Sequence, residues 1–476
     1  MRLGKTTLSH FISQVVVSGA GFVATFAIAQ VLGAEGVGVY ALGAALLIWL
    51  KVPATGLSRG ITKRISELDD PGAYLTTGGL LMAGFGGLVA AAILMFDRQV
   101  NEYVGASVAG LLVVLFLSDV LFGFVGGVLE GEKKVARFGW LKACERVGRT
   151  VVQIVLLLAG YGIAGLFFGH AVALAVTALA GLALVGVRPA MPDRSHARSL
   201  VDFAQYSWVG AVKGRSFGWM DTVVLGFFVG STLIGIYEVA WNLASFLVLV
   251  SNSVQRTLFP EISELSSADR SDRIHHYLEE GLVFTGIFLI PGFFGAIAVG
   301  EAVLRIYSPE FGQGVYVLLL LIGARTLDAF GTQFLSAVEA NDRPDIAFRV
   351  NSVFVVSNVS LNVVLVSMFG WYGAAIATLV SGAVTLVLSY AAVSSLIGSV
   401  DVPYAEMSKQ VVAGGAMFFL VDPAGRLLPQ NPYATVLVVL LGAVTYVCVL
   451  VAISERIRGK VAGLTRSLLQ GSVFEV

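Results

Sequence analysis

Residues 33–40 read Gly-Ala-Glu-Gly-Val-Gly-Val-Tyr, and residues 230–237 read Gly-Ser-Thr-Leu-Ile-Gly-Ile-Tyr. The second stretch lies 197 residues after the first, and the correspondence continues without a gap to residues 68 and 265. The identical positions are Gly33, Gly38, Tyr40, Leu46, Leu50, Arg59, Ile65, Ser66, Glu67 and Leu68, which recur as Gly230, Gly235, Tyr237, Leu243, Leu247, Arg256, Ile262, Ser263, Glu264 and Leu265. A constant offset of this kind indicates an internal duplication, a plan by which many membrane carriers are built.

The composition is that of a membrane protein. Hydrophobic residues make up 57% of the 476 positions and charged residues 13%, and the mean hydropathy is +0.84, which is too apolar for a soluble domain. The formal net charge is zero, so the total charge gives no reason to expect nucleic acid as a partner. The two cysteines, Cys144 and Cys448, lie far apart and form no metal-binding pattern. We therefore expect no cofactor and no metal.

Segments long enough to cross a bilayer, about 20 apolar residues each, predict an all-α polytopic protein with fourteen transmembrane helices. Six helices form an N-terminal bundle (1–195), six form a C-terminal bundle that repeats the first (196–398), and a helix pair with a tail follows (399–476). Because the offset encloses an even number of spans, the two halves are expected to be parallel. The expected spans are 11–32, 37–57, 74–96, 104–128, 147–161, 163–187, 204–229, 232–258, 277–300, 314–337, 346–369, 371–397, 407–422 and 433–453.

Basic residues collect in alternate loops, which is typical of the cytoplasmic side. One set of loops holds most of them, whereas the opposite set holds only Arg98, Arg305 and Arg426. This asymmetry predicts that both termini are cytoplasmic. No loop reaches the length of a folded domain, usually upwards of about 50 residues, so a large catalytic ectodomain is excluded and we expect no enzyme. The basic loop residues include Arg59, Lys63, Arg64, Lys133, Lys134, Arg137, Lys142, Arg146, Arg149, Arg188, Arg194, Arg198, Arg256, Arg343, Lys409, Arg456 and Lys460.

The repeated motif, in its longer form Gln-Val-Leu-Gly-Ala-Glu-Gly-Val-Gly-Val-Tyr at 30–40, resembles the polysaccharide transporter family. These are the Wzx-type flippases of the multidrug/oligosaccharidyl-lipid/polysaccharide (MOP) superfamily, which includes the MATE transporters. Leu-Glu-Gly-Glu at 129–132, echoed by Val-Glu-Ala-Asn at 338–341, and Tyr-Gly-Ile-Ala-Gly at 161–165, echoed by Phe-Gly-Trp-Tyr-Gly at 369–373, agree with it. The first fourteen residues, 1–14, resemble the archaeal branch.

That resemblance implies a fold and a function. The fold would be MATE/MOP-like. The protein would flip a polyprenyl- or dolichyl-(pyro)phosphate-linked oligosaccharide from the cytoplasmic to the outer leaflet of the cell membrane, for surface polysaccharide or glycoprotein glycan assembly. The implied partners are this lipid and the membrane lipids, with Na⁺ or H⁺ and glycan-assembly enzymes as further candidates.

Such a substrate needs positive charge for its phosphate, and four basic residues fall inside expected spans: Lys51, Lys213, Arg215 and Arg325. A charge at a helix centre costs about 2.5–3.5 kcal/mol on insertion scales, so each is expected to face a cavity or a partner. Lys51 either serves the site or snorkels to the interface. Lys213 and Arg215 point about 200° apart on a helix, and Arg215 is the better candidate because its planar fork suits phosphate. Arg325 either serves the site or pairs with Asp328 three residues later.

The acidic residues within or beside the spans are Asp119, Asp221, Glu238 and Asp328. They either bind Na⁺ or H⁺ and couple transport to a gradient, or balance the basic residues. Gln14, Ser18 and Thr25 follow helical spacing on the first span and suit either a hydrated face or helix packing. His170 stands alone in an apolar helix without a metal-ligand companion.

The leading hypothesis is therefore a flippase that works by alternating access, with its two halves rocking around a cationic cavity. One alternative is a cation-coupled multidrug exporter of the same superfamily, which would rely on buried carboxylates and an aromatic pocket. Another is a non-transporting membrane component of a glycan-assembly complex. The cost of the buried basic residues argues against that second alternative.

Overall fold

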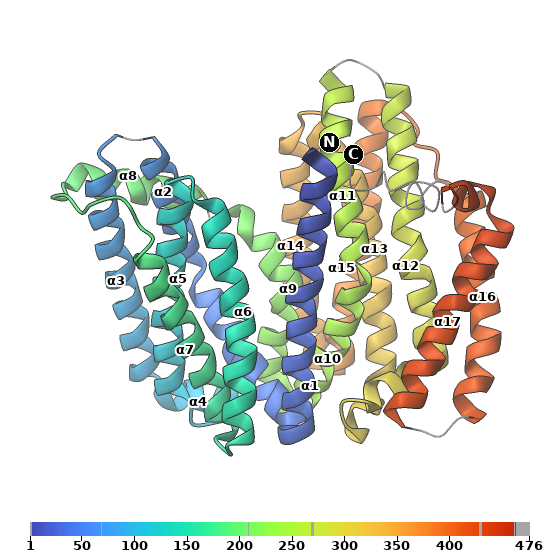
Figure 1. The fold of residues 1–476 in the computed structure, drawn as a ribbon, viewed down its shortest axis with the longest axis horizontal. Helices are drawn as coiled ribbons and strands as arrows, with labels where there is room; N and C mark the ends of the chain where they lie inside the picture. Colours follow the sequence, from blue (N-terminus) through green and yellow to red (C-terminus); the bar gives the residue numbers. More distant parts are fainter. Residues whose placement is uncertain are drawn as a thin grey trace. The chain divides into compact units, whose positions relative to one another are not determined.

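The computed structural model describes the backbone of residues 2–67, 69–207, 209–267, 271–427, 431–460 and 462. Within these ranges, side chains are described from Gly19 onward. The exceptions are Ala20, Tyr206, 209–211, 266–267 and 271–272. Every long element among them is an α-helix (Figure 1). The elements are α1 (Arg2–Leu50), α2 (Val52–Ser66), α3 (Pro71–Met95), α4 (Asp97–Val104), α5 (Ala109–Gly131), α6 (Val135–Leu158), α7 (Gly162–Leu182), α8 (Arg194–Ser207), α9 (Val209–Phe228), α10 (Ser231–Leu247), α11 (Leu249–Ser267), α12 (Ser271–Arg305), the 3₁₀ turn η1 (Pro309–Gly314), α13 (Val315–Ala340), α14 (Pro344–Phe369), α15 (Trp371–Ile397), α16 (Tyr404–Leu427) and α17 (Pro432–Ile453).

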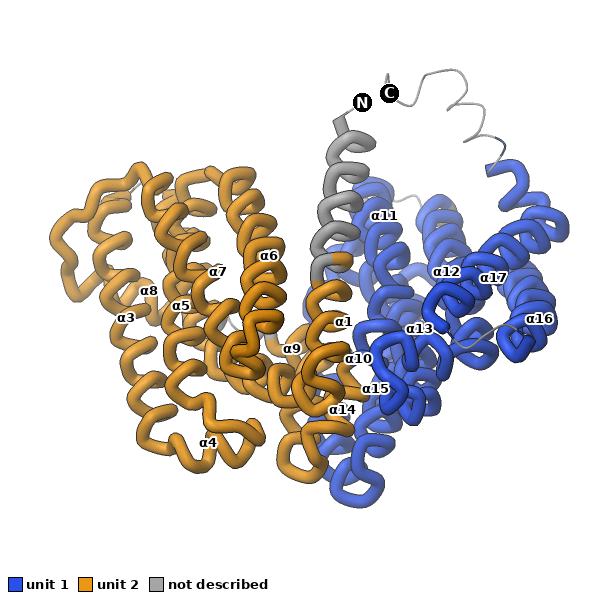
Figure 2. Tube along the Cα trace, turned by 60° about the horizontal axis from the view of Figure 1, so that its bottom comes forward, with its two compact units in different colours: residues 1–15, 239–476 blue, residues 16–238 orange. Residues whose placement is uncertain are grey.

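The chain forms two compact units, drawn in different colours in Figure 2. Unit 2 comprises residues 16–238, and unit 1 comprises residues 1–15 and 239–476. These units are defined by packing, whereas the predicted segments 1–195, 196–398 and 399–476 follow the sequence repeat. The repeat-based division therefore stays a prediction.

The part of the chain that the structure describes has nine helices long and apolar enough to cross a membrane, or ten if the bent pair α10 and α11 is one span. It is thus a multi-pass membrane protein. The expected number of fourteen counts α1 twice, on either side of Gly33, and adds α6, α9 and α16. Each of those three helices carries at least three charged residues, which lower its hydropathy.

The repeated motif contains the junction of two helices, as its place between the first two expected spans predicts. Gly33 has φ 67° and ψ −167°, a non-helical conformation that suits glycine, and the element α1 consists of one helix before this kink and another that runs from it to Leu50. The expected span 37–57 therefore comprises the second part of α1 and the beginning of α2. Lys51 is the single residue between these two helices.

The glycines of the two repeats contact each other inside unit 2. A Cβ atom on Gly38 would lie 1.9 Å from the carbonyl oxygen of Ser231, and one on Gly235 would lie 1.9 Å from that of Ala34. The contact is reciprocal, because Ser231 and Gly235 occupy the positions in the second repeat that Ala34 and Gly38 occupy in the first. Only glycine permits this approach of the two backbones.

Helix α2 packs closely on α5. The Ser58 hydroxyl donates to the Gly123 carbonyl at 2.9 Å, and the Thr62 hydroxyl donates to the Gly127 carbonyl at 3.0 Å. Small residues spaced by four allow this close approach within a membrane. The apolar side of α5, with Leu112 and Phe116 fully buried, belongs to an extended hydrophobic core cluster of unit 2.

Unit 1 is held together by polar groups as well as by apolar packing. Gln333 of α13 donates to the Thr285 hydroxyl of α12 at 3.1 Å, and that hydroxyl lies 2.9 Å from the Ser251 hydroxyl of α11. Helices α16 and α17, the predicted additional pair, pack on α12. Beyond α17, Arg456 binds both Glu279 and Glu280 of α12.

Candidate substrate site

Lys51 lies at the junction of α1 and α2, and its ammonium group forms an ion pair with the Asp119 carboxylate of α5. Pro53, which lacks a backbone N–H, follows at the start of α2. The two charged side chains are 24% and 22% exposed. This pair therefore remains accessible in part, although both residues lie within expected spans.

Arg215 of α9 lies beside this pair. Its Nη2 donates to the Thr55 hydroxyl of α2 at 2.6 Å. It also interacts electrostatically with Arg59, which repels it, and with Asp119, which attracts it. Its Nη1 is buried without a hydrogen-bond partner among the described residues. One prong of this guanidinium is therefore positioned by the protein while the other can bind a ligand.

A second polar group lies where α6, α7 and α1 meet. His170 Nε2 lies 2.9 Å from Arg149 Nη1, and His170 Nδ1 lies 2.9 Å from the Tyr40 hydroxyl. Because a guanidinium can only donate, Nε2 accepts, and the neutral ring carries its hydrogen on Nδ1, which donates to Tyr40. Glu145 completes the group, with its Oε1 3.5 Å from Arg149 Nε.

These two groups form one electrostatic cluster. Glu145 interacts with Arg146 and Arg149 on its own helix and also with Lys51 and Asp119. We define the charge cluster as Lys51, Arg59, Asp119, Glu145, Arg146, Arg149 and Arg215. Five of its members are basic and two are acidic, so its field favours an anion.

The structure brings together three of the predicted site residues, Lys51, Asp119 and Arg215. Lys213 lies on α9 two residues before Arg215, and so about 200° away around the helix axis. The buried carboxylates of Asp221 and Glu238 accept hydrogen bonds from the hydroxyl groups of Tyr237 and Thr222, respectively.

Arg325 belongs to unit 1, and its Nη1 lies 4.0 Å from Asp328 Oδ2, the intrahelical pairing that their spacing suggested. The Arg325 guanidinium also lies 5.2 Å from the centre of the Trp241 ring. On the first span, the Thr25 hydroxyl donates to the Gly21 carbonyl of its own helix. Gln14 and Ser18 have side chains outside the described set.

Sequence reasoning missed the contribution of α6. It placed Arg146 and Arg149 in a loop before a span that starts at residue 147, whereas both residues lie on α6, which is continuous from Val135 to Leu158. The spacing of Glu145 and Arg149 by four residues was the available signal, since it places both on one helix face. His170 also looked isolated, because its partners come from other helices.

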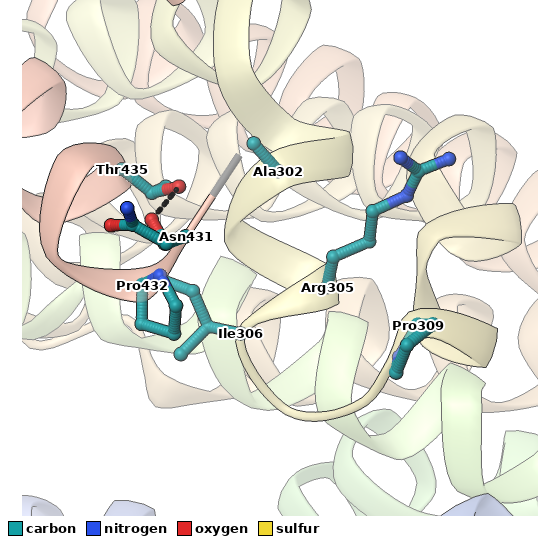
Figure 3. A pocket seen from close by; sticks show the side chains of 7 residues that line it. All are labelled: Ala302, Arg305, Ile306, Pro309, Asn431, Pro432 and Thr435. Atoms are coloured by element: carbon teal, nitrogen blue, oxygen red, sulfur yellow. Dashed lines mark hydrogen bonds between the residues drawn. The ribbon is translucent and has the colours of Figure 1, made fainter. Parts of the chain in front are cut away.

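A cavity of about 450 Å³ lies elsewhere, in unit 1, between the end of α12 and the start of α17 (Figure 3). Asn431, Pro432 and Thr435 line one side of it, and the Arg305 guanidinium points away from them. Arg305 forms an ion pair with Glu301. This cavity contains none of the predicted site residues.

A second cavity in unit 1, of about 490 Å³, lies among α11, α12 and Lys460. Lys460 is paired there with Glu280. Within the described residues, no group of three or more His, Cys, Asp or Glu side chains could hold a metal ion. The charge cluster is therefore the best candidate site.

Comparisons with known proteins agree with a transport role for this architecture. Residues 3–266 match the family model described as polysaccharide biosynthesis protein. A Haloferax volcanii protein named "Probable flippase AglR" is 33% identical over 97% of this chain and 98% of its own length. Another from that organism, named "Probable low-salt glycan biosynthesis flippase Agl15", is 29% identical over 88% of this chain and 90% of its own.

Among solved structures, one described as "Lipid II flippase MurJ, inward closed conformation" superposes with a TM-score of 0.76. The sequences are 14% identical, and the superposition covers 95% of this chain and 98% of that one. At this level of identity, the likeness establishes the fold alone.

Proposed function

Because this chain belongs to the polysaccharide biosynthesis protein family, which it matches over residues 3–266, we propose that it flips a lipid-linked oligosaccharide across the membrane. The resemblance to Wzx-type flippases is confirmed by that match and by the two Haloferax volcanii relatives. The substrate carries a polyprenyl or dolichyl chain joined to its glycan through a phosphate or pyrophosphate. It moves from the cytoplasmic to the outer leaflet by alternating access.

The observation that carries this proposal is the excess of basic residues in the charge cluster. A phosphate group that leaves the interface must exchange its hydration for charged donors. Arg215 offers the unpartnered prong of its guanidinium, and Lys51 offers an ammonium that Asp119 holds in place. Arginine forks and lysine ammonium groups are the usual ligands of phosphate in proteins.

We propose that the protein crosses the cell membrane fourteen times with both termini cytoplasmic, as the distribution of basic loop residues supports. Glycan-assembly enzymes are its proposed partners on the cytoplasmic side. Coupling to Na⁺ or H⁺ would use the acidic residues of the spans, of which Asp119 lies in the charge cluster.

The test uses cells that lack this gene. Mass spectrometry quantifies their lipid-linked oligosaccharides, and an impermeant glycan-modifying reagent reports which leaflet holds them. We expect intact precursor on the cytoplasmic side and loss of surface glycan, both reversed by the wild-type gene but not by a variant with Lys51→Ala and Arg215→Ala. The same variant must reach the membrane in normal amounts.

Two other results would support the alternative functions, a multidrug exporter or a non-transporting membrane component. Normal precursor and glycan together with sensitivity to cationic compounds would indicate a drug exporter. Restoration of the glycan by the double variant would indicate that the basic residues serve no transport role, as expected of a non-transporting component.

A further inference from the structure

The duplication places a helix break at the same position in both repeats. Lys51 is the single residue between α1 and α2, and Val248 is the single residue between α10 and α11. The two residues are 197 positions apart, which is the offset of the repeat. At the second break, the axes of the two helices differ by 42°. At the first, Lys51 keeps φ −79° and ψ −5°, and the backbone hydrogen bonds from Lys51 N to the Leu47 carbonyl (3.0 Å) and from Thr55 N to the Lys51 carbonyl (3.1 Å) continue the helical pattern. The two repeats therefore share the position of the junction, which is bent in the second repeat and nearly helical in the first.

The helix that faces the break is equivalent in the two repeats as well. Asp119 precedes the motif at 129–132 by the same distance as Asp328 precedes its echo at 338–341. In unit 1, Val248 packs in an apolar cluster with Leu289 and Ala329, the neighbour of Asp328. The first repeat places an ion pair at this junction, whereas the second places an apolar contact.

On one side of the first break, α2 is fastened to α5. Asp119, Gly123 and Gly127 are spaced by four residues and form one stripe of α5. The hydrogen bonds from Ser58 and Thr62 hold α2 along the two glycines. The pair of Lys51 and Asp119 ends this row of polar contacts, at the junction of α1 with α2.

We propose that Asp119 is a positioning residue for the substrate phosphate. Its carboxylate holds Lys51 at the helix break, and the ion pair opens when the phosphate binds to Lys51. This inference rests on the proposed function. A phosphate that approaches the Lys51 ammonium also approaches the Asp119 carboxylate. The two negative groups repel each other, and they therefore compete for the ammonium. Release of Asp119 loosens the junction of α1 with α2, and its return expels the phosphate. Binding is thereby coupled to the angle at the break.

Calorimetric titration of the purified full-length protein with a short-chain isoprenyl phosphate tests the competition. Asp119→Asn should bind this probe about tenfold more tightly, since the competing charge is removed. In proteoliposomes, the same variant should show a lower KM for the glycolipid together with a lower maximal rate, because the phosphate is no longer expelled. Lys51→Met should bind more weakly.

A variant with both residues replaced tests whether Asp119 affects phosphate binding through Lys51 or only through the stability of the fold. If Asp119 acts through Lys51, the variant carrying both Lys51→Met and Asp119→Asn should bind the probe as Lys51→Met does. Asp422→Asn is the matched control, because Asp422 pairs with Arg426 on its own helix and is not among the candidate site residues, and its probe affinity should equal that of the wild type. An Asp119→Asn protein that binds the probe no more tightly than an active wild type overturns the inference.

A second measurement avoids substitution of the pair. Spin labels at Glu35→Cys, an exposed position between Gly33 and Lys51, and at Lys63→Cys on α2, with Cys144 and Cys448 replaced by serine, report the angle at the break. The probe should shift the distance between the labels, and an unchanged distance at saturation contradicts the inference. A wild type that neither binds the probe nor moves glycolipid instead contradicts the proposed function itself.

Discussion

Arg215 is the residue at which charge and geometry can be tested separately. Its Nη2 is held by Thr55, while its Nη1 has no partner among the described residues. Arg215→Lys keeps the charge but loses the fork, and should lower the rate of glycolipid flipping in proteoliposomes roughly tenfold. Thr55→Val keeps the guanidinium and removes only its acceptor, so its effect should be smaller. Equal rates for Arg215→Lys and the wild type would show that charge alone suffices.

The identity of the candidate residues was predictable, but their partners were not. Lys51, Asp119 and Arg215 stood out because a charge within an apolar span is costly. The pairing of Lys51 with Asp119 could not be predicted, since these residues are far apart in sequence and meet only when α2 packs on α5. Glu145, Arg146 and Arg149 escaped notice because charge asymmetry assigns clustered basic residues to loops, whether or not a helix continues through them.

At the scale of helices, the reciprocal glycine contact should be among the least tolerant parts of unit 2. Gly38→Ala places a methyl group 1.9 Å from a carbonyl oxygen, so the backbones must separate. We expect a loss of stability above the about 1–3 kcal/mol typical of overpacking. Gly110→Ala is the matched control, because no atom lies within 4 Å of the added Cβ. Thermal unfolding in detergent measures both, and equal melting temperatures would contradict the contact.

Helix positions followed from hydropathy because lipid leaves the backbone few alternatives to a helix. Helix junctions were predicted less completely. The sequence Gly-Ala-Glu-Gly-Val-Gly predicts a connection between two helices, and the structure places that connection at Gly33 alone, with helical residues on both sides of it. The glycines at 38 and 235 serve contact between segments, a role that local sequence does not distinguish from a turn.

At the scale of the whole molecule, orientation can be tested at the two ends of α17. Arg426 precedes this helix and Arg458 follows it, and both side chains are exposed. In a protein with Cys144→Ser and Cys448→Ser, an impermeant maleimide should label Arg426→Cys in intact cells. It should label Arg458→Cys only after permeabilisation, because basic loops lie on the cytoplasmic side. The reverse pattern would invert the proposed topology.

The reciprocal contact also bears on how this chain arose. Gly38 meets the counterpart of Ala34, and Gly235, the counterpart of Gly38, meets Ala34 itself. A contact of this kind is isologous, as at the two-fold axis of a homodimer. An ancestor with a single copy of the repeat would present this surface to a second copy of itself. Fusion of the two genes then fixed the dimer in one chain, and left each half free to diverge, as Lys51 and Val248 have done.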